Sequence, residues 1–227
     1  MIKFLIFDLD ETLYPRNAGL MQNIGARILR YLIERLNLPE DQAQAIKVDY
    51  FQRYGTTLRG LIVERPEVNP EDYLQFVHDI PLADYIGPNP ALADMLRSIP
   101  LTKVIFTNAT VEHAQKVLSI LGCADQFAAI IDVRAVGFVS KPDPRAYQRI
   151  LDLIHAPAGE CMLIEDSPRN LRPAKALGMT TVLVDSNDCD EVDFCVRDIL
   201  GVKAAVDRAM QAAGARGKTR HVTDNKS

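Results

Sequence analysis

Residues 4–12, Phe-Leu-Ile-Phe-Asp-Leu-Asp-Glu-Thr, run from a short apolar segment directly into two carboxylates, Asp8 and Asp10. In an extended chain the side chains of residues i and i+2 share a face. The two carboxylates therefore repel each other unless a cation or a shared proton lies between them. At the carboxyl end of a strand in an open α/β sheet, where such sheets bind ligands, this pattern predicts a Mg²⁺ site with a nucleophile. The alternative is a solvated strand end without chemistry.

The composition narrows the classes of function. The chain has 227 residues, of which 48% are apolar, so it can bury the core of one domain and of a second domain inserted into it. Its formal net charge of −4 argues against binding of nucleic acid through phosphate neutralisation. No apolar run approaches the roughly 18 residues of a membrane span, and a strand that starts at residue 2 leaves no room for a cleavable signal. We therefore expect a cytoplasmic protein that binds neither nucleic acid nor membranes.

The four cysteines, Cys123, Cys161, Cys189 and Cys195, contain no C-x-x-C pair. Buried reduced thiols are the default expectation for such cysteines. For Cys189 and Cys195 the sequence leaves the state open.

A helical region follows the first strand. Apolar residues recur at three- and four-residue steps from Leu20 to Leu36, which predicts one long amphipathic helix. Pro39 opens a second helix that Gly55 closes, and the pairs Asn69-Pro70 and Asn89-Pro90 are start signals for two more. We assign residues 15–85 to a helical cap that lies over the carboxyl edge of the sheet as a lid.

Beyond Pro100 strands and helices alternate. The pattern predicts strands at residues 102–106, 128–131, 161–164 and 180–184, and helices at 111–121, at 144–154 and up to Gly178. This alternation is typical of right-handed crossovers on a parallel sheet. The predicted fold is therefore α/β, with a Rossmann-like three-layer αβα parallel-sheet core and an inserted helical cap domain. The core takes residues 1–14 and 86–212, and residues 213–227, which lack periodicity, form a flexible tail.

Three polar pairs, Thr107-Asn108, Lys141-Pro142 and Glu165-Asp166, follow apolar segments or precede helices. Each alone could be an ordinary turn or a helix cap. Together they supply what a phosphoryl group in transfer requires, which is a metal, a fixed cation and hydroxyl or amide donors.

These pairs, together with Asp8-Leu-Asp10-Glu-Thr12, resemble the four motifs of the haloacid dehalogenase superfamily, over residues 4 to about 185. The resemblance implies that Asp8 is the nucleophile and forms an aspartyl-phosphate. It makes Asp10 the general acid and base, with its backbone carbonyl on Mg²⁺. Dehalogenation is disfavoured, because the members that cleave haloalkanoates lack an Asp at the position of Asp10.

The same resemblance assigns the remaining core residues. Thr107, Asn108 and Lys141 bind the phosphate, and Asp166 completes the Mg²⁺ ligands with Asp8 and Asp10. The fourth motif, Ile-Glu165-Asp166-Ser167-Pro-Arg-Asn170, departs from the commonest forms. Glu165 is therefore either an anchor behind the ligands or a ligand through water, and Asn170 orients carboxylates.

The position of the cap, between the first and second motifs, resembles the capped phosphatase subclass I, whose helical bundle closes over a compact phosphate ester. The stretch from Asp49 to Leu61, with Thr107-Asn108-Ala109 and His113-Ala114, resembles the pyrimidine 5′-nucleotidase branch. This resemblance implies a nucleoside 5′-monophosphate as substrate, with a pyrimidine base favoured. The cap residues implied in binding it are Tyr50, Arg53, Tyr54 and Thr57.

Each of these cap residues also has a structural interpretation. Aromatic side chains at helical spacing usually lie in a core, an arginine can face water, and Thr57 could start a helix. His113 is interpreted as an ordinary helix residue near the site, because no second His or Cys lies at ligand spacing from it.

The predicted function is Mg²⁺-dependent hydrolysis of a small phosphorylated metabolite, by a monomer or homodimer. One alternative is a phosphatase for another small phosphate such as phosphoglycolate or a sugar phosphate. A phosphomutase would pass the phosphoryl group to a sugar instead of water. A module that binds phosphate without catalysis is the remaining alternative.

Overall fold

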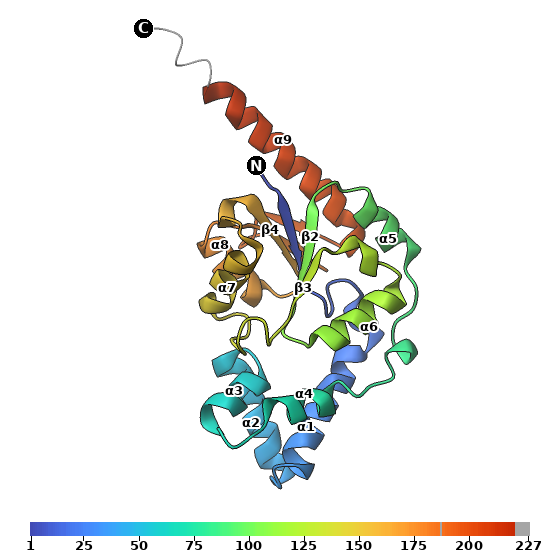
Figure 1. Ribbon diagram of the computed structural model, residues 1–227, viewed down its shortest axis with the longest axis vertical. Helices are drawn as coiled ribbons and strands as arrows, with labels where there is room; N and C mark the ends of the chain where they lie inside the picture. The colour runs from blue at the N-terminus through green and yellow to red at the C-terminus, as the bar shows by residue number, and fades with distance from the viewer. Residues whose placement is uncertain (187, 221–227) are drawn as a thin grey trace.

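The computed structural model describes residues 1–186 and 188–220 and contains one six-stranded parallel sheet, in the order β3-β2-β1-β4-β5-β6 (Figure 1). The strands are β1 Phe4–Phe7, β2 Thr102–Phe106, β3 Ala129–Ile131, β4 Cys161–Glu165, β5 Thr180–Val184 and β6 Phe194–Val196. β1 lies in the middle, where Ile6 is in register with Val104 on one side and Leu163 on the other. The predicted parallel α/β sheet is confirmed, whereas the short edge strand β6 was not predicted.

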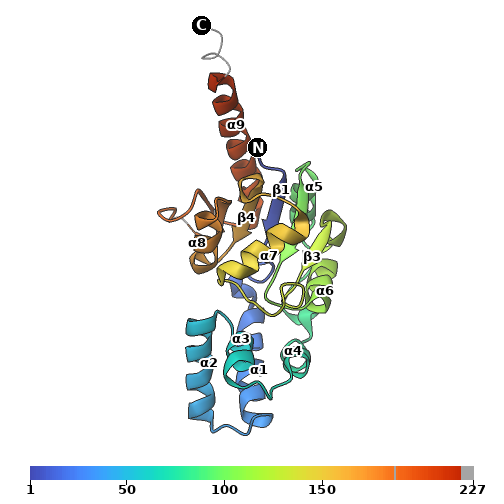
Figure 2. The same cartoon turned by 60° about the vertical axis from the view of Figure 1, so that its left-hand side comes forward.

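Helices cover both faces of this sheet (Figures 1 and 2). α5 (Pro90–Arg97), α6 (Val111–Leu121) and α9 (Val202–Arg220) lie on one face, and α7 (Pro144–Ile154) and α8 (Pro168–Ala176) lie on the other. Because successive side chains of a strand point to opposite faces, Leu5 and Phe7 pack with the first group of helices and Ile6 packs with the second. The result is the predicted three-layer αβα core.

Four helices gather beyond the carboxyl edge of the sheet, at the lower end of Figure 1. They are α1 (Leu20–Glu34), α2 (Glu40–Tyr54), α3 (Thr57–Glu64) and α4 (Pro70–Val77). They share an apolar cluster that includes Tyr31, Leu61 and Tyr73 and is separate from the clusters on the two sheet faces. We keep the division into a cap of residues 15–85 and a core of residues 1–14 and 86–212 as a proposal.

Several polar contacts join these helices to the sheet domain. The hydroxyl oxygens of Thr56 and Ser140 lie 2.9 Å apart, and Arg169 of α8 donates to the carbonyl oxygen of Phe51 at 2.9 Å. Gly55, with a φ of +87°, lies so close to the backbone of Lys141 that a Cβ there would overlap its carbonyl oxygen. The conformation and the space both require glycine at this position.

The end of the chain differs from the prediction. Residues 213–227 were assigned to a flexible tail, but α9 continues to Arg220. The segment is rich in Ala, Lys and Arg, which favour helix by intrinsic propensity without an amphipathic pattern. The rest of the predicted tail, residues 221–227, lies outside the described residues.

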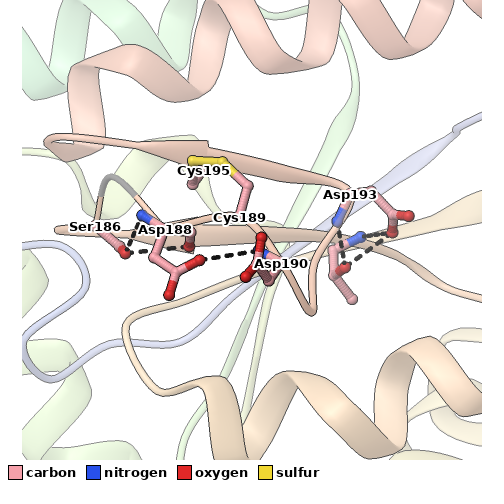
Figure 3. The surroundings of a disulfide bond; sticks show 7 residues. Ser186, Asp188, Cys189, Asp190, Asp193 and Cys195 are labelled. Carbon is pink, nitrogen blue, oxygen red and sulfur yellow. Dashed lines mark hydrogen bonds between the residues drawn. A yellow bond between two sulfur atoms is a disulfide. The ribbon is translucent and has the colours of Figure 1, made fainter.

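A disulfide joins Cys189 and Cys195, between the end of β5 and β6 (Figure 3). Cys123 and Cys161 are buried free thiols, as predicted. Within residues 1–186 and 188–220, no helix combines the length and the apolar character needed to cross a membrane.

Candidate active site

The carboxyl ends of β1, β2 and β4 bring the sequence-predicted core residues together. Asp8 follows β1, Thr107 follows β2, and Glu165 is the last residue of β4. Lys141 reaches them from the loop before α7, and its Nζ lies 2.7 Å from Asp8 Oδ1. Four segments that are distant in the sequence therefore meet at one edge of the sheet, as the fold class predicts.

Lys141 is the centre of this arrangement. Its buried ammonium group donates to Asp8 Oδ1 at 2.7 Å, to Glu165 Oε2 at 2.8 Å and to the carbonyl oxygen of Phe106 at 2.9 Å. All three of its N–H groups are used. Burial alone lowers the pKa of Lys141, but the charges of Asp8 and Glu165 outweigh it and raise that pKa above its usual value. The group is a fixed cation.

Asn108 and Thr107 shape the pocket around the nucleophile. The side-chain amide of Asn108 donates to the carbonyl oxygen of Lys141 at 3.2 Å and accepts from its N–H at 2.9 Å, so it fixes the main chain of Lys141. Thr107 Oγ1 accepts from the N–H of Ala109 at 2.9 Å, which leaves its hydroxyl proton free for a ligand. Asp8 Oδ2 also accepts from Thr12 Oγ1 at 2.9 Å.

The donor set fits a magnesium ion. Carboxylate oxygens of Asp8, Glu165 and Asp166 lie within 4.8 Å of one another, and oxygen is the ligand atom that Mg²⁺ prefers. Burial raises the pKa of Asp8 to about 6, even though Lys141 opposes this shift, and the charge of Asp166 adds to it. Burial, and then the charge of Asp8, raise the pKa of Glu165 well above its usual range. Burial thus disfavours the charged form of both carboxylates, and a divalent cation bound to them would offset that cost.

Asp166 is held by a residue that the sequence analysis did not identify. Arg16 Nη2 lies 2.7 Å from Asp166 Oδ2, and Arg16 Nε lies 3.1 Å from Glu11 Oε2. Residue 167, not Asp166, is the N-cap of α8, so capping does not explain Asp166. Asn170 lines the same cavity from α8.

The carboxylate of Asp10 turns away from the acidic cluster. Its Oδ1 accepts from the hydroxyl of Tyr14 at 2.7 Å and lies 2.9 Å from His113 Nε2. Burial raises the pKa of Asp10, but the His113 ring and the Tyr14 hydroxyl outweigh it, so that the pKa lies below its usual value. The side chain is thus separate from the acidic cluster of Asp8, Glu165 and Asp166. Its lowered pKa favours the carboxylate, which can accept a proton, and donation to a leaving group requires that Asp10 is protonated first. The sequence alone indicates no role for Tyr14 and predicts His113 to be an ordinary helix residue near the site.

A cavity of about 830 Å³ opens above these groups. Its walls come from the sheet edge, with Asp8, Asp10, Thr107 and Lys141, and from the four helices beyond it. The side chains contributed by α1 and α2 are mainly apolar or uncharged, and include Met21, Ile24, Ile28, Gln44, Val48, Phe51 and Gln52, with Lys47 as the cation.

Of the four cap residues that the sequence analysis selected, Thr57 lines this cavity, and Tyr50, Arg53 and Tyr54 do not. The ring of Tyr50 is buried over Gly60 and packs edge-to-face on Tyr54 at 5.8 Å. Arg53 Nη1 lies 3.0 Å from Asp49 Oδ2 on the exposed side of α2. Tyr50, Arg53 and Tyr54 therefore pack within the helices or face water, which is the alternative given for them from the sequence. The opposite face of α2 lines the cavity.

Comparisons with known proteins show the family and the fold of this chain. The family model for hydrolases described as haloacid dehalogenase-like matches residues 2–178. Phosphate metabolism protein 8 of Saccharomyces cerevisiae is 28% identical over 195 residues, which are 80% of this chain and 61% of that protein. Phosphatase MT3486 of Mycobacterium tuberculosis is 28% identical over 145 residues, 64% of each chain. This chain therefore matches less than two thirds of either relative.

Among solved structures, a hydrolase from Pseudomonas syringae superposes with a TM-score of 0.65 and 22% identity, covering 92% of this chain and 99% of that one. At that identity the likeness concerns the fold alone.

Proposed function

This chain belongs to the haloacid dehalogenase-like hydrolases, and we propose that it is a Mg²⁺-dependent phosphatase that works through an aspartyl-phosphate on Asp8. The proposal carries to this chain the activity named for the mycobacterial relative. The observation that carries it is the fixed position of the Asp8 carboxylate at the base of the cavity. Lys141 donates to one of its oxygens and Thr12 to the other, and the carboxylates of Glu165 and Asp166 lie beside it. A carboxylate fixed in this way can attack without first being oriented.

The residues divide the reaction between them. Asp8 attacks phosphorus while the bond from phosphorus to the ester oxygen breaks, and Asp10 gives its proton to that leaving oxygen. Asp10 then takes a proton from water as the water oxygen attacks phosphorus, which frees Asp8 and releases phosphate. Lys141 supplies a fixed positive charge near the oxygens of the phosphoryl group, and the hydroxyl of Thr107 donates a hydrogen bond to them.

The carboxylates of Asp8 and Asp166, with the backbone carbonyl of Asp10, would hold the magnesium ion. When bound, the ion supplies charge neutralisation for the phosphoryl group and for the nucleophile. Glu165, whose Oε2 accepts from Lys141, anchors that cation, and Asn170 orients the neighbouring carboxylates.

The proposed substrate is a nucleoside 5′-monophosphate, with a pyrimidine base favoured. A cavity of about 830 Å³ lies in the range of sites for molecules of drug size, and phosphoglycolate would fill only a small part of it. The apolar side chains of Ile24, Ile28, Val48 and Phe51 offer a base and a sugar a surface to pack on. A sugar phosphate is the second candidate, since the polar groups Gln44, Gln52 and Lys47 could bind hydroxyls. The working form is proposed to be a cytoplasmic monomer or homodimer, as expected from the sequence.

Phosphate release tests this proposal. The purified protein is assayed against nucleoside monophosphates, sugar phosphates, phosphoglycolate and p-nitrophenyl phosphate, with Mg²⁺ and with EDTA. We expect turnover with Mg²⁺ only, with uridine and cytidine monophosphates among the better substrates, and no turnover by Asp8→Asn. Turnover that persists in EDTA contradicts the metal role. Loss of substrate without phosphate release indicates a mutase, and thermal stabilisation by nucleotide and Mg²⁺ without turnover indicates a binding module.

A further inference from the structure

We infer that His113 is a positioning residue, which together with Tyr14 fixes one oxygen of Asp10 and leaves the other oxygen to transfer the proton. The inference rests on the proposed function, in which Asp10 is the general acid and base.

The two contacts meet at a single atom. The Tyr14 hydroxyl at 2.7 Å and His113 Nε2 at 2.9 Å both approach Asp10 Oδ1. Among the described residues, Asp10 Oδ2 has no hydrogen-bond partner, and Asp10 lines the cavity that holds Asp8 and Lys141. The carboxylate is therefore held by Oδ1, whereas Oδ2, in a residue that lines the cavity, is left without a partner in the described part of the chain.

The surroundings of His113 settle which group donates. A carboxylate accepts hydrogen bonds, so His113 Nε2 must carry the proton that points at Oδ1. The second ring nitrogen, Nδ1, is buried and has no partner within residues 1–186 and 188–220. A buried nitrogen without a partner is unfavourable, and an apolar side chain would avoid it. What histidine adds at this position is therefore the hydrogen bond from Nε2 to Asp10.

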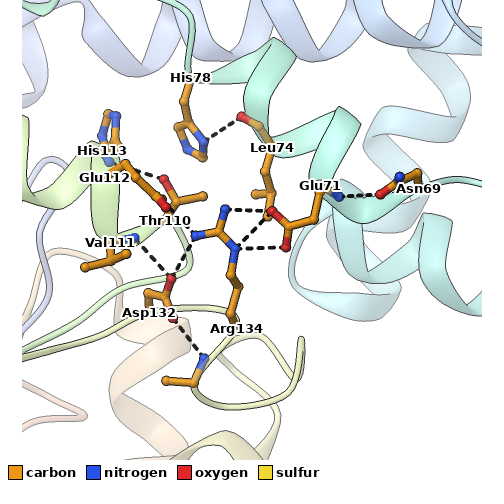
Figure 4. A network of polar contacts seen from close by, with 11 residues as sticks. Asn69, Glu71, Leu74, His78, Thr110, Val111, Glu112, His113, Asp132 and Arg134 are labelled. Carbon is orange, nitrogen blue, oxygen red and sulfur yellow. Dashed lines mark hydrogen bonds and ion pairs between the residues drawn. The ribbon is translucent and has the colours of Figure 1, made fainter.

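Two elements hold the ring in place (Figure 4). The N-cap residue Thr110 accepts from the N–H of His113 at 3.2 Å, which fixes His113 in the first turn of α6. From the opposite side, the ring of His78 packs on the ring of His113 at 4.7 Å between centroids. His78 Nδ1 is itself 3.0 Å from the carbonyl oxygen of Leu74, at the end of α4. The ring of His113 therefore has little freedom to turn away from Asp10.

Asp10 acts in both steps of the proposed reaction, but kcat/KM reports only the first, in which the ester bond breaks. An alkoxide, such as the 5′ oxygen of a nucleoside, is a poor leaving group and needs the proton from Asp10, whereas p-nitrophenolate leaves without it. Loss of the His113 contact should therefore slow cleavage of alkyl esters much more than cleavage of aryl esters. A purely structural role for His113 would lower both rates together.

The experiment compares kcat/KM for uridine monophosphate and p-nitrophenyl phosphate in the wild type, His113→Leu, His113→Gln and Tyr14→Phe. We expect His113→Leu to lose at least about tenfold more activity toward the nucleotide than toward the aryl ester. His113→Gln, whose amide can donate to Oδ1, should recover most of that difference. Tyr14→Phe should show the same selective loss, and it carries the test if His113→Leu does not fold. Exposed His155→Gln is the matched control and should change neither rate.

Two results would overturn the inference: equal losses on both substrates in His113→Leu and Tyr14→Phe, or a His113→Gln protein that behaves like the leucine variant. If uridine monophosphate is not turned over, the best alkyl phosphate of the substrate panel replaces it, so that a wrong substrate does not count against His113. A wild type that hydrolyses p-nitrophenyl phosphate but no alkyl phosphate contradicts both Asp10 as acid and the role of His113. No turnover of any ester contradicts the proposed function itself.

Discussion

The two walls of the cavity are built on different principles. On the sheet wall, each of Asp8, Asp10, Lys141, Glu165 and Asp166 is held by at least one hydrogen bond or ion pair shorter than 3 Å. On the helix wall, formed by α1 and α2, Val48 and Phe51 are 44% and 56% exposed, and neither makes a side-chain hydrogen bond; the ring of Phe51 lies 5.2 Å from the guanidinium of Arg169. The chemistry is therefore fixed before a substrate arrives, while substrate choice depends on apolar packing that single substitutions can change.

Lys141→Met should disrupt the ion pairs of the sheet wall and give the largest effect. It removes the cation that pairs with Asp8 and Glu165, so we expect a loss of about 1,000-fold or more in kcat on every substrate. Two buried carboxylates without the cation that pairs with them should also lower the free energy of unfolding by on the order of 3 kcal/mol. Steady-state kinetics and urea unfolding measure the two effects.

Lys103→Met is the matched control for that variant. Lys103 is also a buried lysine, but its Nζ donates to the carbonyl oxygens of Ile99 and Leu101 at the opposite end of β2. It should keep wild-type kcat. If the two variants lost activity equally, the effect of Lys141 would be one of stability and not of chemistry.

Asp166→Asn should give a smaller loss that added metal partly reverses. The substitution keeps an oxygen and removes a charge, so the Mg²⁺ concentration for half-maximal activity should rise by about 10- to 100-fold. Titration of activity with Mg²⁺ measures this shift. An unchanged Mg²⁺ dependence would remove Asp166 from the ligand set.

Phe51→Ala tests the helix wall. Removing the ring should raise KM for a nucleoside monophosphate by about 10-fold, the scale of a small apolar contact in a pocket, and leave kcat nearly unchanged. Tyr54→Phe, on the face of α2 outside the cavity, should leave both constants unchanged. If instead Tyr54→Phe raised KM and Phe51→Ala did not, the substrate would lie elsewhere than in this cavity.

His78→Phe should give the smallest effect, a change in how the free energy of unfolding depends on pH. Burial, and then the charge of His113, lower the pKa of His78 to about 4, whereas an unfolded chain titrates near 6.5. Between pH 4 and pH 6.5 the unfolded state therefore binds more protons than the folded state. The contribution of neutral His78 to the free energy of unfolding is full above pH 6.5 and is lost as the pH falls toward 4. His78→Phe should reduce the loss of unfolding free energy between pH 7 and pH 4.5 by roughly 1–2 kcal/mol. His155→Phe, at an exposed site, should not. A pH dependence identical to the wild type would contradict this assignment.

The sheet wall was the more predictable of the two. Strand ends of a parallel sheet meet at one edge, so Asp8, Thr107 and Asp166 could be placed near one another from patterns of a few residues each. Contacts such as Arg16 with Asp166, 150 positions apart, or His113 with Asp10, 103 apart, leave no local signal. They depend on loop paths that periodicity does not describe.

The helix wall and the edges of the fold were less predictable. The spacing of Tyr50 and Tyr54 shows that they share one face of a helix, but not whether the cavity or α3 covers it. β6 has three half-buried residues, too few for an alternating pattern. The first turns of α9 carry an apolar stripe, Val202, Ala205 and Val206, that packs on the core. The sequence of residues 213–220 has no such stripe, so periodicity could not predict that the helix continues through them.

Trapping of the nucleophile tests the central claim most directly. The protein is mixed with substrate and Mg²⁺, quenched with borohydride, which reduces an acyl phosphate to an alcohol, and digested for peptide mass spectrometry. We predict homoserine at position 8 in the peptide that contains β1, only when substrate and Mg²⁺ are both present, and no reduction at Asp10 or Asp166. Phosphate release at full rate with Asp8 unmodified at every quench time, or reduction at another carboxylate, would contradict the account.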